Sequence, residues 1–237
     1  MKEIERRIVR AAEALFAERG FEVTWADIAA ATDLSPTMLR RYFRTKSLLV
    51  DKVMARLFAG RWRPEWEGFL GNRAAPLERR LIRFFTEYRA HANRTSTRLW
   101  TRAGLAGMHA SGKYSYHAPL MRRIVLPIVR ELRHELDLEP VEQRPLSPAE
   151  TELVLMLHGS IASASTRTHV FDLPVHGNVA ELVAMMVRVW LPGARAELAR
   201  LHAQPMAATL SALPSQERVA QRPAMVEAEP TTELEIA

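Results

Sequence analysis

Cationic and hydroxyl side chains crowd one short stretch near the beginning of the chain. Arg40 and Arg41 each offer five N–H donors in a planar fork, which suits bidentate contacts to phosphate or to a guanine edge. Such a contact to a base is worth roughly 1–3 kcal/mol of discrimination. Thr37, Tyr42 and Lys46 add donors nearby. This combination predicts an anionic partner, and DNA if the side chains share a helix face.

Two short helices joined by a tight turn are predicted to carry these side chains. Thr24 followed by Asp27 is a capping-box start, and apolar residues then recur at helical spacing. Thr32–Leu34 interrupts the pattern, and Ser35–Pro36 restarts it with an N-cap and a proline in the first turn. This pattern indicates a helix-turn-helix whose second helix enters a major groove. The alternative is a solvated basic face, which is the commoner reading for an isolated helix.

An Ala-rich amphipathic helix precedes this unit and ends at Gly20. Together the three helices predict a small core. Its members are Ile8, Ala12, Leu15, Phe16, Phe21, Ile28, Leu34, Leu39 and Phe43.

The rest of the chain has helical periodicity and no competing strand pattern, so the fold class is all-α. We expect a helix-turn-helix domain over 1–46, a helical ligand-binding and dimerisation domain over 47–203, and a disordered tail over 204–237, where Ala, Pro, Glu, Ser and Thr predominate. Pro127 predicts a kink or a late helix start, and Pro192–Gly193 predicts a break in the last long helix.

Composition limits the possible functions. The 237 residues include no cysteine, which excludes disulfides and thiolate chemistry and fits a reducing cytoplasm. The net charge is +6, with a basic N-terminal quarter and an acidic end, so an anionic partner is expected for the former. No apolar run is long enough for a membrane span, and the first residues lack a signal-peptide pattern. We expect a cytoplasmic, nucleoid-associated protein with no membrane partner.

Residues 6–53 resemble the TetR-type transcriptional repressors. The matching positions are Ala11–Ala12, Leu15–Phe16, Gly20–Phe21, Ile28–Ala29, Leu34–Ser35, Leu39, Tyr42–Phe43 and Lys46. The resemblance implies a homodimer that binds a palindromic double-stranded DNA operator and releases it when a small-molecule effector binds the helical C-terminal domain.

The resemblance also implies which side chains touch DNA. Thr24, Tyr42 and Lys46 are expected to hold phosphates. Ser35, Pro36, Thr37, Arg40 and Arg41 are expected to face bases or the backbone. The helix-turn-helix departs from the family at three positions. Asp33 stands where the family usually has a glycine in the turn, Thr37 where a glycine is frequent, and Arg40 where an aromatic residue is common. Asp tolerates a left-handed conformation, so the turn is expected to form.

A ligand cavity is predicted among aromatic and sulfur-containing residues of the C-terminal domain. Its candidate lining is Trp62, Trp66, Phe85, Tyr88, Arg98, Trp100, Arg102, Met108, Met121, Met156 and His158. Arg98 and Arg102, one helical turn apart, favour an acidic ligand if they face the cavity. For each residue taken singly, ordinary core packing is the competing interpretation.

Small residues near Gly159 predict close helix approach, either within one subunit or across a dimer. We favour a dimer formed by the last two long helices. The candidate interface residues are Gly159, Ala162, Ser163, Met186, Val187 and Trp190.

No catalytic motif, phosphate-binding loop or metal-ligand spacing is present, so neither an enzyme nor a cofactor is expected. The sequence therefore predicts a ligand-responsive DNA-binding transcriptional regulator, most often a repressor in this family. Two alternatives stay open: a helical small-molecule-binding module without specific DNA recognition, and an enzyme acting in the C-terminal cavity.

Overall fold

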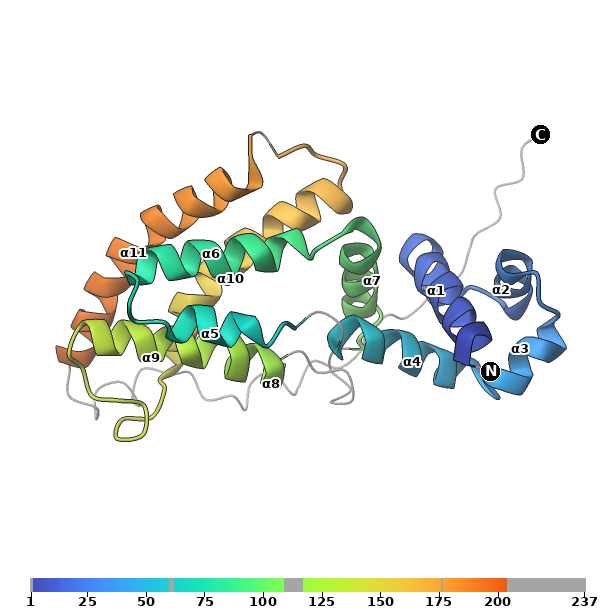
Figure 1. Cartoon of the computed structure of the whole chain (residues 1–237), viewed down its shortest axis with the longest axis horizontal. Helices are drawn as coiled ribbons and strands as arrows, with labels where there is room; N and C mark the ends of the chain where they lie inside the picture. Colours follow the sequence, from blue (N-terminus) through green and yellow to red (C-terminus); the bar gives the residue numbers. More distant parts are fainter. Residues whose placement is uncertain (1, 60–61, 109–116, 176, 204–237) are drawn as a thin grey trace, which may run out of the picture. The chain divides into compact units, whose positions relative to one another are not determined.

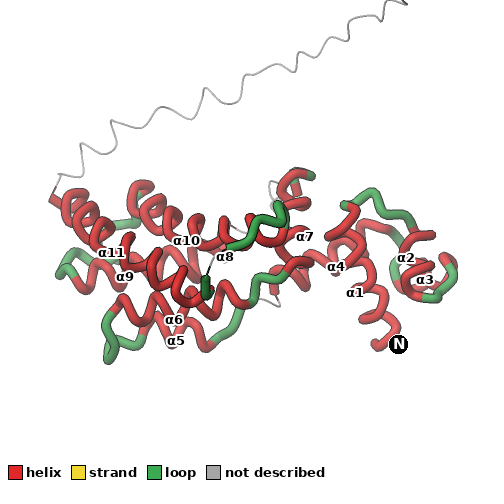
Figure 2. Tube along the Cα trace, turned by 90° about the horizontal axis from the view of Figure 1, so that it is seen from above, coloured by secondary structure: helices red, strands yellow, loops and turns green. Residues whose placement is uncertain are grey.

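The structure, a computed structural model, describes residues 2–59, 62–108, 117–175 and 177–203. Within these ranges the chain consists of helices and loops and has no strand, which confirms the predicted all-α class (Figures 1 and 2). The predicted tail, 204–237, lies outside the described residues.

Four helices form the N-terminal part of the fold. They are α1 (Lys2–Arg19), α2 (Trp25–Thr32), α3 (Pro36–Tyr42) and α4 (Lys46–Ala59). Their apolar sides meet in one cluster, here called the N-terminal cluster, around Ile8, Phe16, Ile28 and Leu39. All nine predicted core residues belong to it; Leu15, Phe21 and Leu34 are partly buried and the other six are buried. The helical spacing therefore located this core correctly.

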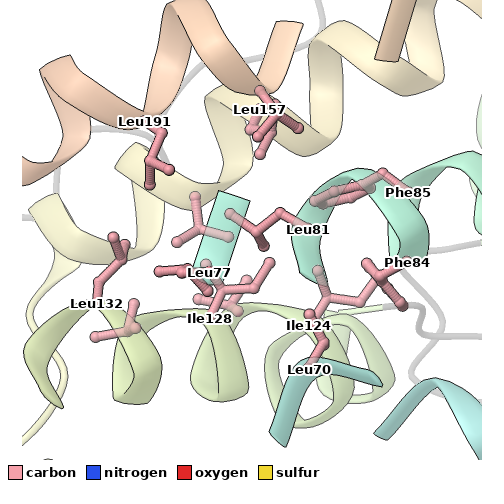
Figure 3. Packing of buried hydrophobic residues seen from close by; sticks show 14 of the residues in the cluster. Leu70, Leu77, Leu81, Phe84, Phe85, Ile124, Ile128, Leu132, Leu157 and Leu191 are labelled. Carbon is pink, nitrogen blue, oxygen red and sulfur yellow. The ribbon is translucent and has the colours of Figure 1, made fainter. Parts of the chain in front are cut away.

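The described residues of the C-terminal part form seven α-helices and one π-helical stretch. They are α5 (Glu65–Gly71), α6 (Leu77–Ala90), α7 (Arg94–Leu105), α8 (His117–Leu120), η2 (Met121–Val125), α9 (Leu126–Glu135), α10 (Pro148–His169) and α11 (Val179–Ala203). All of them except α7 and α8 contribute buried side chains to a second core, the C-terminal cluster. Figure 3 shows Leu81 of α6, Ile128 of α9, Leu157 of α10 and Leu191 of α11 converging there.

Helix α7 packs with the N-terminal helices although it follows α6 in the chain. Leu99 and Ala103 are fully buried in the N-terminal cluster, and Figure 1 shows α7 beside α1. Arg102 binds the end of α1: its Nε lies 2.9 Å from the carbonyl oxygen of Ala17 and its Nη2 lies 2.7 Å from that of Glu18. The last carbonyls of a helix lack partners within the helix, so Arg102 caps α1.

The two internal prolines lie at different places in their helices. Pro127 lies in the first turn of α9, which follows η2 directly, and Val125 and Leu126 at their junction keep right-handed helical angles. The predicted break at Pro192 is wrong, because α11 continues to Ala203. Leu191, Ala194 and Leu198 continue one buried stripe through the proline. We attribute the continuity to this burial, which outweighs the hydrogen bond that proline removes.

Residues 1–199 form one compact unit, and Arg200–Ala237 form a second unit. Of the second unit only the last turn of α11 is described. The boundary between residues 46 and 47 stays a prediction. None of the described helices is both long enough and apolar enough to cross a membrane.

Candidate nucleic-acid interface and ligand cavity

Local hydrogen bonds shape the turn between α2 and α3. Thr24 Oγ1 accepts from the Asp27 N–H at 3.2 Å, and Asp27 Oδ2 accepts from the Thr24 N–H at 2.8 Å, completing a capping box. Asp33 has φ 51° and ψ 35°, the left-handed conformation expected of it. Ser35 Oγ accepts from the Met38 N–H at 3.1 Å and starts α3. The helix-turn-helix predicted from the sequence is therefore present.

The side chains predicted to touch DNA lie mostly in solvent. The exposed ones are Thr24, Ser35, Pro36, Thr37, Arg40 and Arg41. Tyr42 and Lys46 are half-buried, and Tyr42 packs against the N-terminal cluster. Leu39, on the other side of α3, is fully buried. Helix α3 thus has one side in the core and a basic side in water, and its contact with DNA stays a prediction.

The cations of α3 and its C-terminal flank form no ion pair within the part of the chain that the structure describes. These residues, here called the α3 cations, are Arg40, Arg41, Arg44 and Lys46. Nearby on α4, Lys52 pairs with Glu5 at 3.1 Å and Arg56 pairs with Glu13 at 3.1 Å. The positive charge of α3 is therefore left to attract an anion from solution.

Thr24 already uses its hydroxyl proton within the chain. Thr24 Oγ1 donates to Asp27 Oδ2 at 2.6 Å, and Arg19 Nη1 lies 3.0 Å from Asp27 Oδ1. The hydrogen bonds from Thr24, together with Arg19, lower the pKa of the Asp27 carboxyl group. The Thr24 hydroxyl can donate to a phosphate only if it gives up this hydrogen bond to Asp27.

A cavity of about 160 Å³ lies among the C-terminal helices. Five residues predicted to bind a ligand line it: Trp62, Trp66, Tyr88, Trp100 and His158. The rings of Trp62 and Trp66 meet edge to face with centroids 5.2 Å apart, and Trp66 and Tyr88 do so at 5.7 Å. The Tyr88 hydroxyl lies 3.1 Å from His158 Nε2. Burial lowers the pKa of His158 to about 4, so this wall is neutral at neutral pH.

Six other residues predicted to line a ligand cavity do not line this one. They are Phe85, Arg98, Arg102, Met108, Met121 and Met156. Phe85 is fully buried in the C-terminal cluster, whereas Met156 is 64% exposed. Met108 and Met121 are partly buried against the N-terminal and the C-terminal cluster, respectively.

Arg98 and Arg102 are held at the junction of α1, α7 and α10. Arg98 forms an ion pair with Glu18 of α1 and donates from Nε to the His169 carbonyl oxygen at 2.7 Å. Arg102 caps α1, as described above. The spacing of the two arginines on one face was correct, but that face meets α1 and not the cavity.

Several cavity residues were not predicted from the sequence. They are Leu57, Arg89, His91, Ala92, Thr97, Pro119, Leu120, Arg123, Ile161, Ala162, Ser165 and Thr166. A signal for one of them was present, since Arg89 continues the buried spacing of Leu77, Leu81 and Phe85 on α6. A charged residue in an apolar stripe indicates a buried polar site.

The predicted dimer residues divide into an exposed and a buried group. Gly159 and Ser163 on α10 are exposed, and Met186 on α11 is half-buried. Val187 is fully buried in the core of its own chain, and Ala162 lines the cavity. Trp190 donates from its indole N–H to the Leu153 carbonyl oxygen at 2.9 Å, which joins α11 to α10. Beside them on α11, Met185 and Val189 are exposed apolar side chains.

A helix-turn-helix whose basic helix α3 is not neutralised by the described residues, followed by a helical part with a cavity, is typical of DNA-binding transcriptional regulators. The family model of the "Bacterial regulatory proteins, tetR family" matches residues 8–53. The N-terminal segment therefore matches this family, as the resemblance predicted, and the match supports a DNA-binding transcriptional regulator.

Solved structures of TetR-like regulators share the fold. One from Rhodococcus sp. RHA1 has 19% identity and a TM-score of 0.58, with 80% of this chain and 96% of that chain covered. One from Streptomyces coelicolor has 17% identity and a TM-score of 0.56, covering 93% and 94%. One from Pseudomonas syringae pv. tomato str. DC3000 has 18% identity and a TM-score of 0.54, covering 80% and 95%. No curated protein sequence matches this chain significantly.

Proposed function

We propose that the chain is a ligand-responsive transcriptional repressor that binds a palindromic operator as a homodimer. The observation that carries the proposal is the set of α3 cations, which are not neutralised by the described residues of a chain whose N-terminal segment matches a DNA-binding family. Two copies of α3 would enter successive major grooves about one helical turn apart.

Each side chain near α3 has a role in this proposal. Lys46 lies at the start of α4 and Thr24 at the start of α2, where helix amides already favour a phosphate. Tyr42 adds a phosphate contact beside them. Arg40 and Arg41 are long, exposed donors suited to base edges. Ser35, Pro36 and Thr37 form the first turn of α3 and would lie against the DNA backbone or bases.

The exposed side of α10 and α11 supports the homodimer. Met156, Met185 and Val189 are 64%, 50% and 76% exposed, which leaves apolar surface in water. Gly159 and Gly193 lie inside helices, where glycine costs roughly 1 kcal/mol relative to alanine. A Cβ atom added at either glycine would meet no atom of the chain within 4 Å. Glycine at these two positions would allow the helices of a second copy to pack closely against α10 and α11.

Two helices offer a route from the cavity to α3. Helix α4 begins at Lys46 and carries Leu57, which lines the cavity. Helix α7 places Trp100 in the cavity wall, Leu99 in the N-terminal cluster and Arg102 on the end of α1. A ligand that prefers one tilt of α4 and α7 would therefore change the spacing of the two α3 helices.

Footprinting of the full chain on the DNA that flanks its own gene tests the DNA-binding proposal. We expect protection of a two-fold-symmetric sequence whose half-sites are separated by about one helical turn. Uniform weak protection, with no preference over random DNA even at low salt, would contradict it and would favour a binding module without operator recognition.

The homodimer is tested by light scattering on size-exclusion fractions. Val189→Glu introduces a charge into the exposed apolar side of α11 and should convert the dimer to a monomer. Leu105→Glu is the matched control, because Leu105 is 86% exposed at the end of α7 and is not one of the exposed apolar residues of α10 and α11. A monomeric wild-type chain would contradict the proposal, as would a Val189→Glu variant that dimerises as strongly as the control.

A further inference from the structure

Among the described residues three arginines are buried, and two of them have carboxylate partners. Arg80 Nη1 lies 2.6 Å from a carboxylate oxygen of Glu131. Arg133 contacts both oxygens of Glu150, each at 2.8 Å. The third, Arg89, is only 7% exposed and lies on α6 with Arg80. Arg89 is therefore the one of these three buried arginines for which no carboxylate partner is described.

Arg89 lacks the partners that the other two arginines have. No carboxylate within the described ranges forms an ion pair with it, and its Nε is buried without a hydrogen-bond partner. Burial lowers the pKa of the Arg89 guanidinium. A buried guanidinium N–H group that has no acceptor costs free energy. Because Arg89 lines the cavity, that cavity is the space in which an acceptor can bind.

Aromatic rings form part of the remaining cavity wall, which Arg123 also lines, 5.1 Å from the centre of the Trp62 ring. Trp62, Trp66, Tyr88 and Trp100 present ring surfaces, and His158 is neutral because burial lowers its pKa to about 4. The volume of about 160 Å³ resembles the roughly 150 Å³ of an engineered apolar cavity that holds benzene. A single ring therefore fits the space.

We propose that this cavity binds a one-ring aromatic monocarboxylate, whose carboxylate accepts hydrogen bonds from Arg89 and whose ring packs against Trp66 and Tyr88. The inference rests on the proposed ligand response for its biological role, although the binding itself requires no DNA. The acidic ligand predicted for Arg98 and Arg102 is assigned here to a different arginine, because α1 and α10 occupy those two side chains.

Calorimetric titration of the full chain with three benzene derivatives tests the charge requirement. Benzoate, benzyl alcohol and benzylammonium have similar size and differ in charge. We expect saturable binding of benzoate, with the neutral and the cationic compound weaker by roughly tenfold or more. Benzyl alcohol or benzylammonium binding as tightly as benzoate would overturn the proposal.

Substitution of Arg89 tests the contact. Arg89→Met should weaken benzoate binding by roughly tenfold or more and leave benzyl alcohol unchanged. Arg89→Lys, which keeps the charge but loses the fork, should give an intermediate affinity. Arg79→Met is the matched control, since Arg79 lies exposed on the same helix and does not line the cavity. Circular dichroism verifies that each variant is folded. If a variant does not fold, the titrations of the wild-type chain with the three compounds still test the proposal.

The outcomes separate this inference from the proposed function. Failure of benzoate to bind the wild-type chain, or equal binding by Arg89→Met, overturns the inference without affecting DNA recognition. Benzoate binding that depends on Arg89 but does not change the affinity for DNA supports the inference and contradicts the ligand response.

Discussion

The arginines of α3 and the buried Arg89 both lack an ion-pair partner among the described residues, but their surroundings are opposite. On α3, Arg40 and Arg41 extend into water, where an unpaired guanidinium costs little because it stays hydrated. In the cavity, Arg89 is buried and its Nε has no partner. The first arrangement suits a large, hydrated polyanion that is bound in a salt-dependent manner. The second suits one small anion that completes an internal site. The same type of side chain is therefore proposed to bind two different partners, because it is exposed on α3 and buried in the cavity.

The largest effect should come from removing a paired buried arginine. Arg133→Met leaves Glu150 buried without its partner and should lower the free energy of unfolding by roughly 3–5 kcal/mol. Arg89→Met strands no carboxylate and should leave the free energy of unfolding unchanged or raise it. Urea denaturation of the ligand-free chain measures both values. If both variants lost the same free energy of unfolding, Arg89 would have a stabilising partner within the chain. The contrast between Arg89 and the paired arginines would then be wrong.

The cavity should also make stability depend on pH. The folded-state pKa of His158 is about 4, below its usual 6.5, so the unfolded chain takes up a proton that the folded chain rejects. This contribution is fully present above pH 6.5 and disappears as the pH falls through the folded pKa near 4. It amounts to about 3 kcal/mol, at 1.36 kcal/mol per pKa unit.

Urea denaturation between pH 7 and pH 4 detects this term. His158→Gln should flatten the decline in stability across that range, whereas His134→Gln, at an exposed position on α9, should not. An unchanged decline in His158→Gln would show that other groups cause it.

On α3, the expected effect of one arginine is on sequence preference. Arg40→Ala should reduce discrimination between the operator and single-base variants by roughly 1–3 kcal/mol at the contacted position. Fluorescence anisotropy with the two DNA sequences measures the difference. Arg56→Ala, which removes an exposed arginine paired with Glu13 on α4, is the control. Equal loss of affinity for operator and random DNA would assign Arg40 to the phosphate backbone.

The smallest expected effect concerns a single phosphate contact. Lys46→Ala should weaken binding to every DNA sequence alike and reduce the slope of log K against log salt by roughly 0.9 for each lost contact. Lys52→Ala serves as the control, because Lys52 lies on the same helix and pairs with Glu5. An identical slope in both variants would remove Lys46 from the interface.

Features that depend on neighbouring residues in the sequence were predictable. The N-caps at Thr24 and Ser35 and the left-handed Asp33 all agree with the structure, because each is determined by hydrogen bonds or sterics within a few residues. The helical spacing of apolar residues likewise identified the N-terminal cluster, with Ile28 and the other predicted members inside it.

Features that depend on distant packing were not predictable. Arg98 and Arg102 were assigned to a cavity, but the end of α1 packs against α7 and accepts their hydrogen bonds. Pro192 was expected to break α11, although Leu191 and Ala194 remain buried on either side of it. In each case the answer depends on which helices meet, and local periodicity does not contain that information. Arg89 was missed for the same reason, because its missing partner is visible only in three dimensions.

The specificity ratio of the wild-type chain tests the central claim most directly. Equilibrium dissociation constants are measured for the footprinted operator and for random DNA of equal length at one physiological salt concentration. The account predicts that the operator binds at least roughly a thousandfold more tightly. Equal dissociation constants for the two DNAs would contradict it.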